Sequence, residues 1–215
     1  MRKTELASIA VRALEELYPD AICSLNYEDA FQLLIATRLS AQCTDARVNI
    51  VTKPLFTAFP DAPSMAKADI SQIEELIKSC GLYKTKARDL SGIARMLCEE
   101  FDGKVPDSIE QLTRLPGVGR KTANLVCGDI YGLPAVVTDT HFIRLCNRLG
   151  LVNTTNPLKV ENEMRRLLAP DKSNDFCHRC VLFGRDICTA RKTYCERCPL
   201  NTVCPSSNQK TKQRR

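Results

Sequence analysis

The amino-acid sequence predicts an all-α protein built from many short helices. Apolar residues recur three or four positions apart in one segment after another, as they do along the buried face of a helix. The β-branched stretch AVVT at residues 135–138 is short and indicates an extended link rather than a strand. Prolines fall where the periodic segments begin or end, at Pro54, Pro60, Pro63, Pro106, Pro134, Pro157 and Pro170.

The periodic segments give the expected helices in chain order. The first carries Ala7, Val11, Leu14 and Leu17, the second Ala30, Leu33, Leu34, Thr37 and Ala41, and the third Ile70, Ile73, Ile77 and Cys80. Further helices are expected over residues 87–101, 141–149, 157–168 and 173–184. Two more flank a glycine-rich hairpin in the middle of the chain.

This hairpin, LPGVGRKT at residues 115–122, is the most informative segment. Asp107 and Glu110 predict a capping box for a short helix before it, which ends at Pro116. Gly117 and Gly119 can both adopt positive φ and allow the backbone to approach an anion closely. The helix expected over 120–131 turns its unpaired N–H groups and its positive dipole end toward the hairpin. We therefore expect a phosphate-binding helix-hairpin-helix.

Lys121 lies in the first turn of that second helix. The positive dipole end disfavours an ammonium group there, so the amine is expected to be a better nucleophile. A Walker phosphate loop requires glycine directly before the Lys-Thr pair, but Arg120 stands there, which argues against a nucleotide triphosphatase. An ordinary turn with a solvated lysine remains an alternative.

Composition restricts the classes of protein to consider. With 215 residues, of which 44% are hydrophobic, the chain is long enough for one large or two small domains. No apolar run approaches the roughly 20 residues that span a bilayer, and the N-terminus does not resemble a signal peptide, so we expect a cytoplasmic protein without membrane contacts.

The net charge of the chain is +6. Four of these positive charges come from an acid-free C-terminal tail, which leaves only +2 for the rest of the chain. The four basic residues of the tail are Lys210, Lys212, Arg214 and Arg215.

The twelve cysteines fall into two groups. Six are scattered singly, and we interpret them as small buried side chains: Cys23, Cys43, Cys80, Cys98, Cys127 and Cys146. Four others, Cys188, Cys195, Cys198 and Cys204, have the spacing C-x6-C-x2-C-x5-C, which favours zinc or an iron–sulfur cluster. A zinc ribbon formed by Cys177, Cys180, Cys195 and Cys198 is a rival set.

The loop between the first two cysteines of this C-x6-C pattern carries Arg191 and Lys192. Metal bonds at both ends would make it a stiff basic loop suited to phosphates. A merely solvated loop is the alternative.

Taken together, these motifs resemble the endonuclease III family of DNA glycosylases, within the helix-hairpin-helix superfamily. The resemblance covers essentially all of residues 20–204. It is carried by LSAQCTD at 39–45, GLYKTK at 81–86, LPGVGRKTAN at 115–124, VTDTH at 137–141 and the four-cysteine loop.

The resemblance implies two helical lobes with duplex DNA, carrying damaged bases or abasic sites, bound in the groove between them. Residues 21–133 would form a central helical barrel with the helix-hairpin-helix. Residues 1–20 and 134–204 would form a discontinuous lobe with a 4Fe-4S cluster, and 205–215 a basic disordered tail. A monomer is expected, associated with the nucleoid if the source is bacterial.

The resemblance also implies roles for single residues. Lys121 would be the nucleophile and Asp139 its carboxylate partner; on its own, Asp139 fits a helix N-cap equally well. Gln42 would enter the space left by the flipped nucleotide and Leu82 would wedge the base stack apart, where a helix-end amide and a core leucine are the plain alternatives. The remaining expected DNA contacts are Gly117, Val118, Gly119, Arg120, Thr122, Arg191 and Lys192.

The function implied is a bifunctional DNA N-glycosylase and apurinic or apyrimidinic site lyase that removes oxidised pyrimidines from duplex DNA during base excision repair. Such an enzyme turns the damaged nucleotide out of the duplex before reacting with its sugar. Three alternatives remain open: a monofunctional mismatch glycosylase of the same superfamily, a non-catalytic DNA-binding module, and a zinc-ribbon protein.

Overall fold

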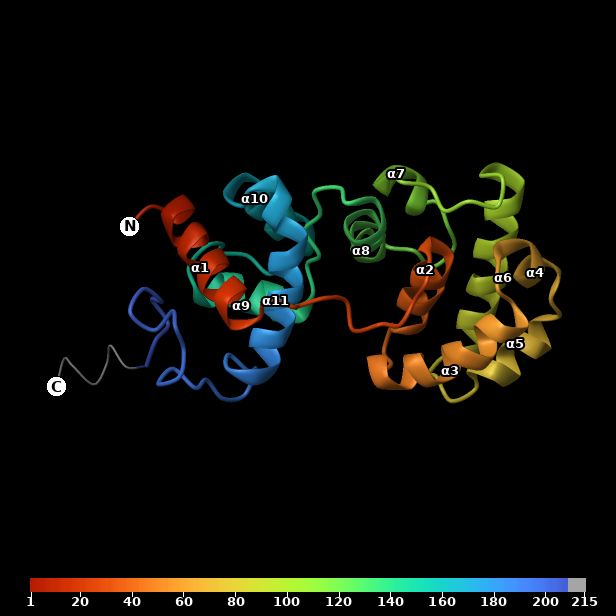
Figure 1. The fold of residues 1–215 in the computed structure, drawn as a ribbon, viewed down its shortest axis with the longest axis horizontal. Coiled ribbons are helices and arrows are strands. Elements are labelled where there is room, and N and C mark those ends of the chain that lie inside the picture. The colour runs from red at the N-terminus through yellow and green to blue at the C-terminus, as the bar shows by residue number, and fades with distance from the viewer. Residues whose placement is uncertain (209–215) are drawn as a thin grey trace. The chain divides into compact units, whose positions relative to one another are not determined.

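The computed structural model describes residues 1–208, and the regular elements in this part are helices, as the sequence predicts (Figure 1). Within these residues there is no strand, and Cys188 and Thr193 form an isolated antiparallel bridge. None of the described helices is long and apolar enough to cross a membrane. The expected basic residues Lys210, Lys212, Arg214 and Arg215 lie outside the described residues.

The chain divides into two compact units. Unit 1 comprises residues 1–22 together with 133 onward, and unit 2 comprises residues 23–132. Unit 1 contains α1 (Lys3–Leu17), α9 (Thr140–Arg148), α10 (Pro157–Leu167), η1 (Pro170–Lys172) and α11 (Ser173–Asp186). Unit 2 contains α2 (Ala30–Leu39), α3 (Asp45–Ala58), α4 (Ala62–Lys67), α5 (Ile70–Ile77), α6 (Tyr83–Glu100), α7 (Ile109–Leu112) and α8 (Arg120–Tyr131).

Most helices begin at a polar side chain that accepts a hydrogen bond from the first turn, which explains where the chain starts to coil. These N-caps are Asp29, Thr44, Asp61, Asp69, Ser108, Asp139 and Asn156. Each satisfies a backbone N–H that has no partner within its own helix.

Each unit has its own apolar core. In unit 2, α6 packs against α4 and α5, and α8 packs against α2, which buries Leu33, Ile73 and Leu90 completely. In unit 1, α11 packs against α1 and α9, with Phe142 and Phe176 in edge-to-face contact at 6.0 Å between ring centroids. These cores hold in place the segments that carry the predicted site residues.

Two sequence-based expectations about the helices are corrected. Helices α3 and α4 were not among the expected elements, and Pro54 does not mark a boundary because it lies inside α3. Burial of Val48, Val51 and Leu55 stabilises α3 enough to offset the hydrogen bond that proline cannot make. Asp61 and Ser64 form the capping box that starts α4.

The scattered cysteines are also less uniform than expected. Cys80, Cys127 and Cys146 are buried, whereas Cys23, Cys43 and Cys98 are only partly buried. At the other end, residues 205–208 belong to the described chain although the sequence assigns them to the tail. Ser207 is buried there and donates its backbone N–H to the Cys204 carbonyl at 3.2 Å.

Candidate functional site

The helix-hairpin-helix consists of α7, the turn and α8. Its first helix begins one residue later than the sequence predicts, because Ser108 rather than Asp107 is the N-cap and accepts from the Gln111 N–H at 3.2 Å. The second helix begins at Arg120 with Gly119 as N-cap, as expected. The predicted D-x-x-E capping box is therefore wrong, since the neighbouring serine supplies the same chemistry at a better position.

The two glycines of the hairpin have different roles. Gly117 has φ +67°, and a Cβ atom there would lie 2.4 Å from Nε of Arg38 and 2.5 Å from Oδ2 of Asp89. Gly119 has an extended backbone with φ −95°, so its expected positive φ is wrong, and a Cβ there would meet no atom within 4 Å. Only Gly117 is required by the fold of the hairpin itself.

Beneath Gly117, Arg38 of α2 and Asp89 of α6 form an ion pair in which Arg38 Nε donates to Asp89 Oδ2 at 2.8 Å. Both side chains are largely buried. The pair joins two helices directly under the turn, and the sequence analysis did not find it. A single arginine near the end of the mostly apolar segment AFQLLIATRL was its only signal.

Gly117→Ala is expected to destabilise the protein by ~1–2 kcal/mol through its left-handed backbone, and by a further ~1–3 kcal/mol through displacement of the Arg38–Asp89 pair. Gly132→Ala is the matched control, because Gly132 also has a positive φ (+62°) but a Cβ there meets no atom within 4 Å. Chemical denaturation of both variants measures the difference. Equal losses of stability would show that the ion pair moves aside at no cost.

Lys121 is exposed in the first turn of α8. No side chain caps this end of the helix, so the first-turn N–H groups have no acceptor at the N-cap. The Val118 N–H is used within the hairpin, where it donates to the Leu115 carbonyl at 3.1 Å. Arg120 is exposed and Thr122 is half-buried beside Lys121.

Gln42 and Leu82 lie in two loops whose backbones are in contact. A Cβ at Gly81 would lie 3.6 Å from the Gln42 carbonyl oxygen. Gln42 and Leu82 have φ values of +54° and +59°, which non-glycine residues rarely adopt. Gln42 lies just beyond the end of α2, and Leu82 is 61% exposed, so Leu82 is not a core side chain. Such strained backbones concentrate at functional sites.

Asp139 belongs to unit 1 and is the N-cap of α9, where Oδ1 accepts from the Phe142 N–H at 2.7 Å. The cap uses one of the two carboxylate oxygens and holds the half-buried side chain in a defined position. A structural role and a chemical role are therefore compatible for this residue. Lys121 belongs to unit 2.

The next turns of α9 carry two arginines that the sequence analysis missed. Arg144 donates to the carbonyl oxygens of Gly184 at 2.9 Å and Cys188 at 3.0 Å, and lies 3.2 Å from Nδ1 of His141. Arg148 donates to Sγ of Cys188 at 3.2 Å and to the Thr189 carbonyl at 2.7 Å. Their spacing of four residues on one helix was the available signal.

The four cysteines of the C-x6-C-x2-C-x5-C pattern line one small cavity in unit 1. Arg148 and apolar residues that include Leu145, Leu149, Phe183 and Leu200 complete its walls. Cys177 and Cys180 of the rival ribbon are instead buried on α11, where Cys177 Sγ donates to the Ser173 carbonyl at 3.2 Å. Over residues 1–208, no group of three or more His, Cys, Asp or Glu side chains has an arrangement that would hold a single metal ion.

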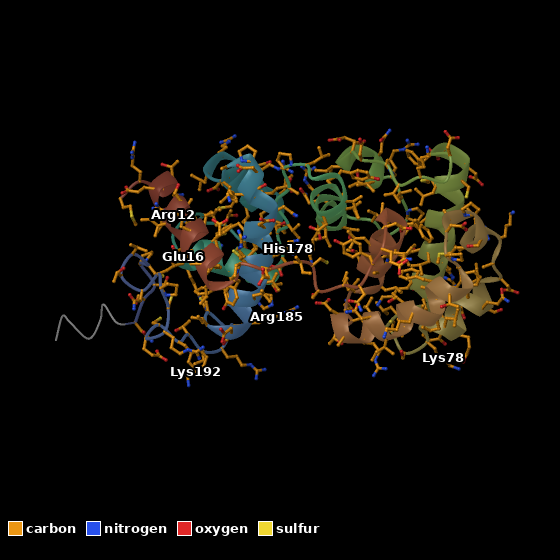
Figure 2. All side chains as sticks on the ribbon, viewed as in Figure 1. Arg12, Glu16, Lys78, His178, Arg185 and Lys192 are labelled. Atoms are coloured by element: carbon orange, nitrogen blue, oxygen red, sulfur yellow. The ribbon has the colours of Figure 1, made fainter. Side chains whose placement is uncertain are left out.

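The basic loop over residues 189–194 is closed by its own hydrogen bonds. The Thr189 hydroxyl donates to the Lys192 carbonyl at 2.6 Å and accepts from the Lys192 N–H at 3.0 Å. Arg191 and Lys192 are both exposed. Lys192 comes after the end of α11 in the chain, and Arg185 lies in the last turn of that helix (Figure 2). Lys192 Nζ lies 4.7 Å from the centroid of the Tyr194 ring.

Comparison with known proteins assigns this arrangement to a family. A model described as "HhH-GPD superfamily base excision DNA repair protein" matches residues 35–170, which include the hairpin, Lys121 and Asp139. The chain belongs to this HhH-GPD superfamily. Relatives named endonuclease III are 46% identical in Synechocystis sp., over 95% of this chain and 94% of theirs, and 36% identical in Escherichia coli K12, over 95% and 96%. The predicted membership of the endonuclease III family is confirmed.

Solved structures have the same fold as this chain. A structure of a trapped endonuclease III–DNA covalent intermediate matches with a TM-score of 0.91 and 36% identity, covering 98% of this chain and 100% of that one. A thermostable thymine-DNA glycosylase matches with a TM-score of 0.86 at 24% identity, which supports the fold alone. The all-α prediction is confirmed.

Proposed function

We propose that this protein is a bifunctional DNA glycosylase and abasic-site lyase that removes oxidised pyrimidines from duplex DNA. The observation that carries the proposal is an exposed lysine in the first turn of α8, directly after a glycine hairpin. The relatives are named endonuclease III, and one similar structure is a covalent endonuclease III–DNA intermediate. A covalent intermediate requires a nucleophilic side chain, which Lys121 supplies.

The chemistry begins when the unprotonated Lys121 amine attacks C1′ of the flipped nucleotide. The N-glycosidic bond breaks and the damaged base leaves with its electron pair. Loss of a proton from nitrogen and opening of the sugar ring give a protonated Schiff base. Removal of a C2′ proton then allows the C3′–O bond to break by β-elimination, with the strand end leaving as a phosphate. The Asp139 carboxylate stabilises positive charge on the sugar and assists the proton transfers.

The hairpin holds DNA phosphate in this proposal. The start of α8 turns N–H groups and a positive dipole end outward, and the open space at Gly119 admits a phosphate oxygen. Arg120 and Thr122 add side-chain contacts from the same turn, and Gly117 and Val118 shape the hairpin. Arg191 and Lys192 bind phosphate from the basic loop of unit 1.

Gln42 and Leu82 act on the base stack. Their exposed side chains come from adjoining loops of unit 2, and both backbones are held in the left-handed region. Gln42 supplies an amide that can hydrogen-bond to an unpaired base. Leu82 supplies an apolar wedge that separates base pairs.

A cleavage panel tests the proposed function. Duplexes with thymine glycol, an abasic site, oxidised guanine or a G·T mismatch are incubated with the protein, with and without borohydride. We expect cleavage and a borohydride-trapped adduct with thymine glycol and the abasic site. Mismatch excision without an adduct would favour the monofunctional glycosylase, and salt-sensitive binding without cleavage would favour the DNA-binding module.

We propose that Cys188, Cys195, Cys198 and Cys204 hold a 4Fe-4S cluster. The four thiols line one cavity, its other walls are largely apolar, and the Arg148 guanidinium donates to Sγ of Cys188. When bound, the cluster supplies iron–thiolate bonds that tie residues 188–204 into one unit. Arg144 and Arg148 position the same segment through its carbonyl groups.

Cys204→Ser is expected to lower the iron content of the purified protein to less than about half of the wild-type value, because one of four ligands is lost. Cys177→Ala is expected to leave iron unchanged. The zinc ribbon predicts the opposite pattern, with Cys177 required and Cys204 dispensable. Iron and zinc determination on both variants, together with visible absorbance, separates the two ligand sets.

A further inference from the structure

Two cysteines lie directly beside the strained residues of unit 2. Cys43 follows Gln42, and Cys80 precedes Leu82 by two positions. Their loops are in contact, because a Cβ at Gly81 would lie 3.6 Å from the Gln42 carbonyl oxygen. The catalytic chemistry described above uses neither thiol.

Lys86 links the same two segments through a buried hydrogen bond. Its side chain is completely buried in α6, and its Nζ donates to the Leu39 carbonyl at the end of α2 at 2.8 Å. Burial lowers the pKa of Lys86. Lys86 therefore links the end of α2, from which the Gln42 loop continues, to the first turns of α6, which follow the Leu82 loop.

The two thiols differ in exposure. Cys80 is 1% exposed, and its thiol faces that of Cys43. Burial and the hydrogen bond to Cys43 raise the pKa of Cys80 to about 11, while Lys86 and Arg47 act in the opposite direction. Cys43 is only partly buried. A small oxidant therefore reaches the more exposed thiol of Cys43 first. The thiol of Cys80 is buried and protonated.

We propose that Cys43 and Cys80 are a redox modification site, at which hydrogen peroxide forms an intrachain disulfide joining the loop after α2 to the loop before α6. The Cys43 sulfur attacks one peroxide oxygen, the O–O bond breaks, and one water leaves as Cys43 becomes a sulfenic acid. The Cys80 sulfur then attacks the Cys43 sulfur, and the hydroxyl leaves as a second water with the Cys80 proton. Two thiols are oxidised and one peroxide is reduced to two waters.

The disulfide alters the geometry of the two loops. It brings the sulfur atoms to about 2.05 Å, closer than two unbonded thiols approach, and so fixes the spacing of the two loops. The effect on DNA rests on the proposed function of Gln42 and Leu82. A displacement of about 1 Å in a positioning residue can cost as much as ~10²-fold in rate, so we expect the oxidised protein to cleave lesions more slowly.

Peptide mapping tests the modification independently of DNA. Trypsin releases Cys43 in the peptide LSAQCTDAR and Cys80 in SCGLYK. Cluster-loaded protein is treated with peroxide at a dose that leaves its iron content unchanged, alkylated and digested without reductant. We expect a linked species with the summed mass of both peptides less two hydrogens. It should persist in Cys98→Ser and be absent from Cys80→Ala.

Two results would overturn the modification site. One is recovery of both peptides only as separate alkylated thiols. The other is a Cys43 sulfenic acid, captured by dimedone, without any linked peptide at any time.

The functional consequence has its own measurement. Peroxide treatment should reduce thymine-glycol cleavage by wild-type protein roughly ten- to a hundredfold, with recovery after thiol reductant and little change in Cys43→Ser. A linked peptide with an unchanged cleavage rate would refute the effect on DNA. If reduced wild-type protein cleaves no lesion at all, the proposed function fails while the mapping result stands.

Discussion

Lys121→Ala is expected to abolish the borohydride-trapped adduct and to reduce cleavage of thymine-glycol duplexes by about 10³-fold or more, the scale seen when a catalytic nucleophile is removed. The Schiff base needs a primary amine, and alanine has none. The substituted side chain is exposed in the first turn of α8, so the fold should remain intact. Gel analysis of the adduct and single-turnover cleavage measure the two effects.

Lys53→Ala is a matched control because Lys53 is also exposed on a helix of unit 2. It should retain both adduct formation and cleavage. An undiminished adduct in Lys121→Ala would show that another amine forms the Schiff base and would remove the central residue of the proposed mechanism. Lesion binding by Lys121→Ala should persist, because the hairpin amides and phosphate contacts are still present.

Asp139→Asn is expected to lower base excision by roughly 10²–10⁴-fold while leaving stability nearly unchanged. The asparagine side-chain oxygen can still accept from the Phe142 N–H, so α9 keeps its cap, but the negative charge is lost. Asp139→Ala should lose activity and also ~0.5–2 kcal/mol of stability, because the cap disappears. Single-turnover excision and thermal unfolding of both variants distinguish charge from capping.

The outcome decides between the two roles of Asp139. If Asp139→Asn excises thymine glycol at the wild-type rate, the residue acts only as the cap of α9. If both variants are equally destabilised, the hydrogen bond to Phe142 depends on the charge as well as on the acceptor.

The sequence predicted most helices because apolar spacing is a local signal. The segment of Ala7, Val11, Leu14 and Leu17 became α1, and residues 120–131 became α8. Helix α3 was missed because proline was interpreted as a boundary at Pro54. Burial of one face of α3 in the core outweighs the tendency of proline to end a helix. Helix propensity alone does not include this packing.

The chemistry of the site was visible in the sequence where it depends on residue type and spacing. Lys121 after a glycine turn, and four cysteines within seventeen residues, are patterns of this kind. Arg144, Arg148 and Lys86 were not found, because their importance lies in partners far away in the chain. Arg148 contacts Cys188 forty residues later, and Lys86 contacts Leu39 forty-seven residues earlier.

The amino-acid sequence by itself determined the helical class, the family resemblance and the residue types able to carry out the chemistry. Each of these depends on residues that lie close together in the chain. Only the tertiary structure decided which side chains share an environment. It showed that the Arg38–Asp89 pair requires Gly117 to lack a side chain. It also joined the loops of Cys43 and Cys80, thirty-seven positions apart, since packing of α2 against α6 sets such distances and local spacing does not.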